Sequence, residues 1–418
     1  MRELNRKQFL AAATAAAVTA GGVRAARAQT PDPTPEPISG AEGGTILGPR
    51  NVPIERENPN VLVPPGTDAG YMSNLKFPFA AARMRLDPGG WARQVNTLDL
   101  PVASTIAGVD MRLQAGAIRE LHWHSAGEWA LMLAGDARIT AMNPNGANFI
   151  ADVRDGDLWF FPTGVPHSIQ GLGQGCEFLL VFDQGDFSEF GTFLLTDWIS
   201  HTPHDVLAKN FGVPEAAFSK IPPDLEQQRY IFPSSVPGPI SRVGIKSPEG
   251  TVPESFAYRT SDQKPIDCPG GRVRIVDSSN FKASKAIAAA IVEVDPGGMR
   301  ELHWHPNADE WQYYVSGQAR MTVFAANGTA NTFDYQAGDV GYVPFPMGHY
   351  IENTGNDTLR FLELFRAPRF EDVSLNQWMA MTPRELIRAH LPIDSRTIDA
   401  FSKRKQIVVG GTARDPSP

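Results

Sequence analysis

The chain has 418 residues, enough for two domains of ordinary size with additional tails. Its formal net charge is −8, although the first 28 residues carry five basic side chains against one acidic one. This acidic balance argues against nucleic acid as a partner, because nucleic-acid-binding proteins contact phosphates through clustered cations. The 38 glycines and 35 prolines favour many short strands joined by turns over long helices.

Residues 1–28 have the pattern of an export signal. Arg6-Lys7-Gln8-Phe9-Leu10 precedes an alanine-rich run, and Ala26-Arg27-Ala28 offers a cleavage site before Gln29. The segment is similar to a twin-arginine signal with Lys7 in place of the second arginine. The run is too short to span a bilayer, which needs about 20 strongly apolar residues. We expect an exported protein, periplasmic or extracellular in a bacterium, with no membrane association after signal removal. The alternative is a cytoplasmic protein with a disordered tail.

Two repeats follow this segment. Residues 29–70 are rich in proline and glycine and are predicted to form an extended arm. The repeats span 71–219 and 256–402, with a proline-rich linker at 220–255 and a tail at 403–418. Short apolar runs between glycine- and asparagine-containing turns predict an all-β sandwich or barrel for each repeat.

Each repeat is predicted to end in a helix. Thr202-Pro203 and Thr382-Pro383 would each place an N-cap residue before a proline at the first helical position. Trp198 and Trp378 precede them at matching positions, so the repeat extends to these helices. Three histidines in these segments are interpreted as helix-surface residues: His201, His204 and His390.

Cys176 and Cys268 are the two cysteines of the chain. They could form one disulfide in an oxidising compartment, but two cysteines so far apart in sequence do not establish one. Their spacing is not that of metal ligands, so we interpret both as small core residues.

The most informative feature is a set of three histidines and one glutamate that occurs once in each repeat. Residues i and i+2 of a strand face the same side, so each His-Trp-His aims two imidazoles at one point. The glutamate follows on the next segment, and the last histidine comes from a distant strand. The first set is His122, His124, Glu128 and His167, and the second is His303, His305, Glu310 and His349.

Three imidazoles and one carboxylate form a metal-binding set without a thiolate. The set suits Mn²⁺, Fe²⁺, Ni²⁺, Cu²⁺ or Zn²⁺, and the ligands alone do not choose among them. A six-coordinate ion would keep two positions open for water, substrate or O₂. That arrangement is typical of a catalytic site rather than a purely structural one.

Arg119 and Arg300 each lie three residues before the first histidine of a set. An odd separation puts the arginine on the opposite face of a regular strand, so it reaches the metal only at a bulge or a strand entry. Beside a metal, a guanidinium would bind the second carboxylate of a small dicarboxylate. The alternative is a surface ion pair.

The ligand pattern resembles the cupin family, and both repeats fill every ligand position of its two-part motif. The resemblance covers most of residues 71–402 and implies two tandem jelly-roll β-barrels with short flanking helices. The first repeat has Gly171 where the family has the asparagine seen at Asn353, and the second has Pro346 in place of a glycine. Neither position supplies a ligand.

Several phrases also resemble the oxalate decarboxylases, which are two-domain manganese cupins. They include the two Arg-Glu-Leu-His-Trp-His segments, Leu195-Thr-Asp-Trp198 and Asp372-Val-Ser-Leu-Asn-Gln-Trp378. The resemblance implies Mn²⁺ as the cofactor, two ions per chain, with O₂ as a co-catalyst. It also implies oxalate as the small-molecule substrate and a homo-oligomer that is a trimer or a hexamer.

The same resemblance implies a lid that supplies the catalytic acid and base. The matching residues are Ser188-Glu189-Phe190-Gly191-Thr192. Glu189 is kept, but Phe190 and Gly191 depart from the pattern, which leaves lid closure and product partition open. The second repeat has no matching lid. Glu363 is implied to be an acid near the second metal, and its alternative is a barrel-wall carboxylate.

The implied reaction converts oxalate to formate and CO₂ without net oxidation. Oxalate would bind the metal at the first set through one carboxylate, while Arg119 polarises the other. After a one-electron oxidation that depends on O₂, Glu189 would remove a proton, CO₂ would leave, and Glu189 would return a proton to carbon. The main chemistry is therefore expected at the first set, and the second set is expected to be structural, electron-transferring or auxiliary.

Three tryptophans complete the predicted sites. Trp123 and Trp304 are expected to point away from the metals, and we interpret them as core or interface packing residues. The resemblance offers an alternative, in which they stack across a subunit contact and carry an electron. Trp159 is expected to line the first site.

Three other functions compete with oxalate decarboxylation. Oxalate oxidase would give CO₂ and hydrogen peroxide, and a distorted lid would favour it. A two-domain cupin dioxygenase acting on an aromatic substrate would need neither Arg119 nor Glu189. A storage or sugar-binding protein of this fold commonly lacks metal ligands, whereas this chain has all eight.

Overall fold

The computed structural model describes residues 51–221 and 230–411, so the predicted export signal lies outside the described residues. Contacts divide the chain into two compact units, Met1–Val63 and Pro64–Pro418. The described part of the first unit contains two short helices, α2 (Val52–Glu57) and α3 (Pro59–Leu62). The structure thus differs from the predicted extended arm. A proline lies in the first turn of each helix, where its missing N–H costs no hydrogen bond.

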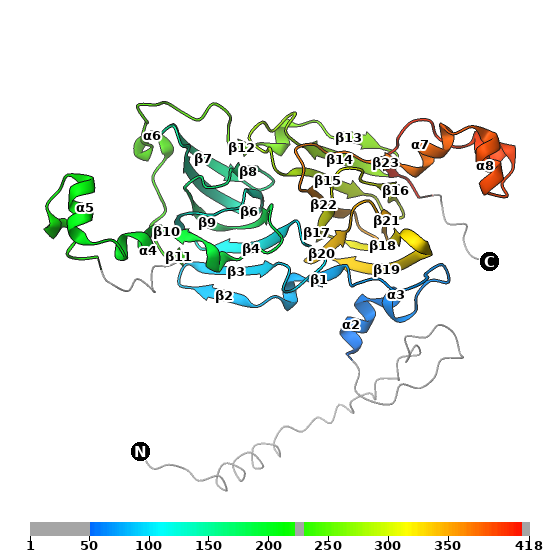
Figure 1. Cartoon of the computed structure of the whole chain (residues 1–418), viewed down its shortest axis with the longest axis horizontal. Helices are drawn as coiled ribbons and strands as arrows, with labels where there is room; N and C mark the ends of the chain where they lie inside the picture. Colours follow the sequence, from blue (N-terminus) through cyan, green and yellow to red (C-terminus); the bar gives the residue numbers. More distant parts are fainter. Residues whose placement is uncertain (1–50, 222–229, 412–418) are drawn as a thin grey trace, which may run out of the picture. The chain divides into compact units, whose positions relative to one another are not determined.

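The second unit contains two β-barrels, one from each repeat (Figure 1). Some strands alternate buried and less buried positions, as expected when one sheet face lines a core, whereas others are buried along their whole length. The strands of the first repeat are β2 (Met84–Asp87), β3 (Gly90–Val95), β4 (Ala107–Leu113), β5 (Ile118–Trp123), β6 (Glu128–Met142), β7 (Asn148–Arg154), β8 (Leu158–Phe161), β9 (His167–Phe182), β10 (Phe193–Leu194) and β11 (Ile231–Phe232).

The second repeat forms the same kind of antiparallel barrel. Its strands form two separate sheets, whereas the long strands β6 and β9 run through both layers of the first barrel. The strands of the second repeat are β13 (Ile266–Cys268), β14 (Gly271–Val276), β15 (Ala288–Val294), β16 (Met299–Trp304), β17 (Glu310–Ser316), β18 (Gln318–Ala325), β19 (Thr329–Gln336), β20 (Asp339–Val343), β21 (Gly348–Asn353), β22 (Leu359–Phe365), β23 (Val373–Ser374) and β24 (Val408–Val409).

The two barrels exchange edge strands. Strand β1 (Lys76–Pro78) precedes the first barrel but pairs with β20 of the second. Strand β12 (Ala257–Tyr258) precedes the second barrel but pairs with β8 of the first. The predicted repeats begin at residues 71 and 256 and therefore include β1 and β12, respectively. In the structure, each of these short strands joins the barrel of the other repeat, so the structure differs from the predicted boundaries. Each exchanged strand covers an otherwise open sheet edge.

Helices follow the last long strand of each barrel. Each repeat has two consecutive helices where one was predicted, because Thr202 and Thr382 bond through their hydroxyls to the carbonyls of Trp198 and Trp378 and end the first helix. Proline, rather than threonine, then occupies the N-cap of the next. The helices are α4 (Leu195–Ser200), α5 (His204–Phe211), α6 (Ile240–Val243), α7 (Leu375–Ala380), α8 (Arg384–His390) and α9 (Ser395–Asp399).

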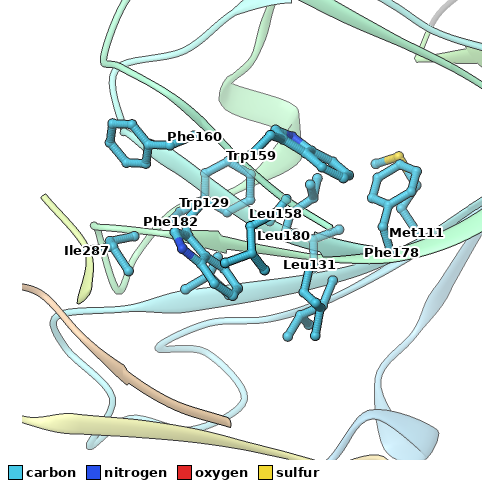
Figure 2. Packing of buried hydrophobic residues seen from close by; sticks show 14 of the residues in the cluster. Met111, Trp129, Leu131, Leu158, Trp159, Phe160, Phe178, Leu180, Phe182 and Ile287 are labelled. Atoms are coloured by element: carbon cyan, nitrogen blue, oxygen red, sulfur yellow. The ribbon is translucent and has the colours of Figure 1, made fainter. Parts of the chain in front are cut away.

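A buried hydrophobic cluster continues from the first barrel into the second. It contains Trp129 and Phe182 together with Ile287 of the second repeat (Figure 2). Trp311 of the second repeat belongs to the same cluster. Gly108 on β4 makes room for Trp311, since a Cβ there would lie 2.6 Å from the indole ring. This shared core and the exchanged strands fix the two barrels to each other.

The cysteines do not form a disulfide. Cys176 is buried, as predicted, whereas Cys268 is only partly buried, and both are free thiols. Among the described residues, no helix has the length and apolar character needed to cross a membrane.

Candidate metal centres

Each metal set is held at the same place in its barrel. His122 and His303 lie on β5 and β16, paired with His167 on β9 and His349 on β21. The register shifts between Arg119 and His122, and likewise between Arg300 and His303. A bulge of this kind lets a residue at an odd separation reach the same face of the strand as the histidine. Both arginines are buried, and their charges act on His122 and His303.

The ligand atoms of each set converge. In the first set, the Glu128 Oε2 atom lies 3.2 Å from His124 Nε2 and 3.5 Å from His167 Nε2. In the second set, Glu310 Oε2 lies 3.0 Å from His305 Nε2 and 2.7 Å from His349 Nε2. Within each set the four ligand atoms all lie within 4.8 Å of one another, and every ligand is buried.

Backbone carbonyls fix the orientation of the imidazoles. In all six rings, Nδ1 lies 2.5–3.1 Å from a main-chain oxygen and donates its proton there. A neutral ring with its proton on Nδ1 presents a lone pair at Nε2. Each site is therefore a cluster of three imidazole lone pairs and one carboxylate, all of which are acceptors.

Such a cluster requires a cation. The Nε2 atoms of His303 and His305 lie only 3.1 Å apart, although both present lone pairs. The Nε2 atoms of His167 and His349 are buried without a hydrogen-bond partner among the described residues. A divalent metal ion would bind these acceptors and remove their mutual repulsion. The residues present thus fit a metal ion at both sites.

Electrostatics keeps the ligands in their metal-binding forms. Burial, together with the charge of the neighbouring arginine, lowers the pKa of His122 and His303 well below the ordinary value. Burial opposes ionisation of Glu128 and Glu310, but the adjacent histidines hold the pKa of each well below its usual range. These shifts favour the neutral imidazole of His122 and His303 and the ionised carboxylate of both glutamates, which are the species that bind metal.

The outer oxygen of each glutamate has a different donor in the two barrels. Trp159 on β8 donates its indole N–H to Glu128 Oε1 at 3.1 Å, so Trp159 lies at the first site, where it was expected. Gln312 on β17 donates to Glu310 Oε1 at 2.8 Å. Position 341, opposite Gln312, is a glycine, and a Cβ there would lie 2.4 Å from the Gln312 oxygen. The first repeat therefore supplies this hydrogen bond from β8, the strand next to that of its glutamate, and the second supplies it from β17, the strand that carries its glutamate.

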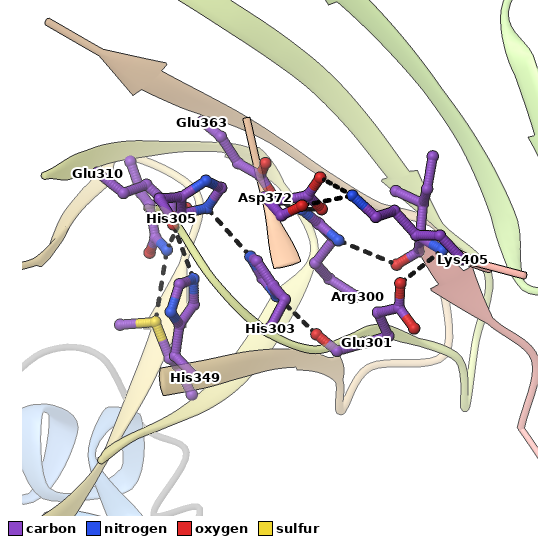
Figure 3. Close-up of polar contacts among 12 residues, drawn as sticks. Arg300, Glu301, His303, His305, Glu310, His349, Glu363, Asp372 and Lys405 are labelled. Atoms are coloured by element: carbon purple, nitrogen blue, oxygen red, sulfur yellow. Dashed lines mark hydrogen bonds and ion pairs between the residues drawn. The ribbon is translucent and has the colours of Figure 1, made fainter. Parts of the chain in front are cut away.

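Arg300 at the second site is paired with two carboxylates (Figure 3). It donates from Nε to Glu363 Oε1 at 2.9 Å and from Nη2 to Asp372 Oδ2 at 2.7 Å. Lys405 also binds Asp372. Burial raises the pKa of Glu363 even though Arg300 opposes the shift. Glu363 is thus both a wall residue of β22 and an acid close to the second metal set.

Arg119 at the first site has no such partners. Its Nε and Nη1 atoms are buried without a hydrogen bond to any described residue. The positions that match Glu363 and Asp372 in strand register are Leu180 and Thr192, and neither carries a charge. Burial lowers the pKa of Arg119, while the nearby charge of Glu189 opposes this shift. A buried guanidinium with unused donors is suited to bind an anion.

The lid residues lie beside this arginine. Ser188 caps the short 3₁₀ helix Glu189–Gly191 by accepting a hydrogen bond from the N–H of Phe190. Glu189 is only 5% exposed, whereas Phe190 is 71% exposed. The Glu189 carboxylate pairs with Arg85 on β2 at 2.9 Å. Glu189 and Arg85 both line an open cleft of about 580 Å³.

The tryptophans within the His-Trp-His pairs face away from the ligands. Trp123 stacks on Phe193 and meets Trp198 edge to face, with ring centroids 5.5 and 5.4 Å apart. Trp304 makes the equivalent contact with Trp378 at 5.6 Å. Both tryptophans therefore pack against the helix that follows their barrel, which is the packing role that the sequence suggested.

Sequence reasoning missed Arg85, Gln312 and the pairing role of Asp372. Gln312 lies two residues after Glu310 on one strand, so the period of two could have found it. Asp372 stands in a quoted phrase, but its contact with Arg300 spans 72 residues. Arg85 lies 104 residues from Glu189 in no recognisable motif, and no local signal could have found it.

Comparisons with known proteins agree with this geometry. A family model described as Cupin matches residues 81–217 and 258–399. The oxalate decarboxylase OxdC of Bacillus subtilis is 54% identical over 90% of this chain and 97% of that relative. A probable oxalate decarboxylase of Arthroderma benhamiae is 43% identical over 88% of this chain and 91% of its own length. A solved structure, from work on the Mn(II) centres of the Bacillus subtilis enzyme, superposes with a TM-score of 0.88, at 54% identity over 90% of this chain and all of that one.

The two metal sets are expected to bind metal independently. His167→Ala and His349→Ala should each lower the bound metal by one ion per chain, and the double variant should bind none, because each change leaves too few ligands in one cluster. Elemental analysis of purified protein measures this. His201→Ala, at the end of α4, is the control that should retain full metal content. Full metal content in either single variant would contradict the assignment.

Proposed function

The chain belongs to the cupin family, with oxalate decarboxylases among its relatives, and from that premise we propose that it is an oxalate decarboxylase converting oxalate to formate and CO₂. The observation that carries the proposal is the pair of buried Arg119 donors, Nε and Nη1, that have no hydrogen-bond partner among the described residues and lie beside the first metal set. A small dicarboxylate has one carboxylate for a metal and a second for this arginine.

The cofactor is Mn²⁺, with one ion held by each set of three histidines and one glutamate. When bound, the metal together with O₂ supplies the one-electron oxidation and reduction that oxalate cleavage requires. The ligands alone would also suit Fe²⁺, Ni²⁺, Cu²⁺ or Zn²⁺. We choose Mn²⁺ because the solved relative has Mn(II) centres.

The roles of the chain's own residues follow from their contacts. Arg119 would orient the outer carboxylate of oxalate and stabilise its charge, because its donors lie buried and unused. Glu189 is the acid closest to this arginine on the lid, so it would remove a proton from oxalate and return one to the carbon of formate. The 3₁₀ helix capped by Ser188 places that acid on the inner side of the lid.

The second site is proposed to be auxiliary. Glu363 and Asp372 already use the donors of Arg300 that an incoming carboxylate would need. A dicarboxylate would have to displace two buried ion pairs to bind there, and breaking such pairs is costly.

Oxalate oxidation to CO₂ and hydrogen peroxide is the second candidate. The outer part of the lid favours it, because Phe190 is exposed and a side chain at Gly191 would meet nothing within 4 Å. A lid held this loosely admits water more readily during turnover.

We also propose that the chain forms a homo-oligomer of three or six copies. Helices α4 and α7 present Trp198 and Trp378 at 62% and 57% exposure, and Phe211 and Met381 are exposed apolar residues of the same helical segments. Exposed aromatic faces of this kind mark protein interfaces. We further propose export through the signal at residues 1–28, a proposal supported by the sequence pattern alone.

Formate without stoichiometric peroxide is expected when the manganese-loaded protein is incubated with oxalate. Glu189→Gln should lower formate production by at least about 100-fold with unchanged metal content, because a positioned acid–base group contributes about 10²–10⁴-fold. Formate and peroxide are assayed in the same sample. Glu215→Gln, on the surface beyond the helices, is the control. Peroxide without formate would favour oxidase, and no oxalate consumption would remove both functions.

Oligomer size is expected to depend on the exposed tryptophans. Sedimentation should give a mass of three or six chains for the wild type, and Trp198→Glu should shift it toward smaller species, since a charge is costly in an apolar interface. Leu98→Glu changes another exposed apolar residue outside these helices and should have no effect. A monomeric wild type would contradict the proposal.

Export is expected to depend on Arg6 and Lys7. Full-length protein expressed in a bacterium should be recovered outside the cytoplasm with Gln29 as its first residue, as mass spectrometry would show. The double change to glutamine should retain the uncleaved chain in the cytoplasm. Uncleaved wild-type protein in the cytoplasm would support the alternative of a disordered tail.

A further inference from the structure

The inner face of the lid is held by side chains from the hairpin of β2 and β3. We propose that Arg85 is a positioning residue that holds the Glu189 carboxylate inside the first site. Its effect on the reaction rests on the proposed function, whereas its effect on the lid does not.

The base of the lid is fixed next to the metal ligands. Asn96 on β3 donates to the carbonyl of Phe187 at 2.9 Å. The Phe187 ring stacks on Phe182 at 3.5 Å and lies 5.7 Å from the ring of His124. The segment immediately before Glu189 is therefore held against the wall of the first site.

Beyond this base, the lid has few contacts. The Glu189 N–H donates to Gln94 Oε1 at 3.1 Å, and the Glu189 carboxylate binds Arg85 Nη2 at 2.9 Å. Phe190 is largely exposed, and the space beside Gly191 is open. The charged pair with Arg85 is thus the strongest contact that the described residues offer to the carboxylate, because hydrogen bonds between ions are about twice as strong as neutral ones.

Arg85 is itself held in one orientation. Its Nη1 binds Asp87 on the same strand, and its guanidinium lies 4.3 Å from the centre of the Tyr230 ring. Planar guanidinium groups combine these two contacts well, whereas a lysine ammonium does not. The donor that reaches Glu189 is therefore preorganised.

The position of Glu189 between two arginines explains why this contact matters. Arg85 binds one carboxylate oxygen, and Arg119, which faces the same Tyr230 ring at 5.6 Å, lies on the side of the metal ligands. Without Arg85, the carboxylate can follow the exposed part of the lid into solvent. The first site then loses its acid and gains access to water, which favours peroxide over formate.

The test compares Arg85→Gln with Arg83→Gln. Arg83 lines the same cleft, so its removal deletes an equal charge without deleting the Glu189 contact. Hydrogen exchange of the backbone amides of residues 189–192 is measured on both manganese-loaded variants, along with kcat, KM and the ratio of peroxide to formate. We expect Arg85→Gln to exchange at least several-fold faster, to lose roughly tenfold in kcat and to raise the peroxide share, as expected when a charged hydrogen bond is lost. Arg83→Gln should match the wild type.

Three results would overturn the proposal. The first is that Arg85→Gln and Arg83→Gln show the same amide exchange in the lid and the same ratio of peroxide to formate. The second is a rise in KM in both variants with unchanged exchange, which would indicate that both arginines only guide the anionic substrate. The third applies if Arg85→Gln loses metal or stability: Glu189→Gln, which removes the same ion pair from the lid side, then decides, and lid exchange as slow as in the wild type would count against Arg85.

The proposed function is tested separately by the same samples. If wild-type protein makes no formate from oxalate, the proposed function fails, and hydrogen exchange still decides whether Arg85 holds the lid. If wild-type protein makes formate and Arg85→Gln leaves the lid unchanged, only the role of Arg85 fails.

Discussion

The structure depends on the need to neutralise two buried clusters of acceptors. Each barrel directs three imidazole lone pairs and one carboxylate at one point, and the Nδ1 protons are already used by backbone carbonyls. Without a cation, these atoms repel one another in a dry interior, where the cost of unpaired polar groups is high. Metal binding and barrel closure are therefore coupled, since the last histidine comes from the strand that pairs with the first.

The two metal sets have the same ligands but different neighbouring residues. In the first, a tryptophan from the neighbouring strand binds the outer oxygen of the glutamate, and in the second a glutamine from the same strand as the glutamate does so, with a glycine opposite it. Two further positions in matching register decide how each arginine behaves. Leucine and threonine leave Arg119 without a carboxylate, whereas Glu363 and Asp372 satisfy Arg300. A few substitutions in the same barrel fold thus leave Arg119 with free donors suited to an anion, whereas Arg300 is held in a network of ion pairs.

The sequence was sufficient for the local part of this arrangement. The period of two within His-Trp-His and the order of the ligands predicted two metal sets, and both ligand clusters are present. The odd spacing of the arginines required a bulge or a strand entry for them to reach the metal, and the structure has a bulge in both repeats. The contacts that distinguish the sites were not predictable in this way. Arg85 meets Glu189 across 104 residues, and strands β1 and β12 cross to the other barrel. Such pairings depend on which edges the folded sheets leave open, and that information is not local.

The contrast between Glu189 and Glu363 explains why one acid is suited to move a proton and the other is not. Both are buried carboxylates bound to an arginine. Glu363 belongs to the middle of strand β22, where neighbouring strands and Arg300 fix it on both sides. Glu189 belongs to a one-turn helix with an exposed outer surface, and its arginine comes from a separate hairpin. A proton donor has to approach its substrate and then withdraw, so the loosely built lid has a chemical advantage that the rigid wall lacks. That freedom is useful only if something returns the acid to the site, which is the role proposed for the Arg85 pair.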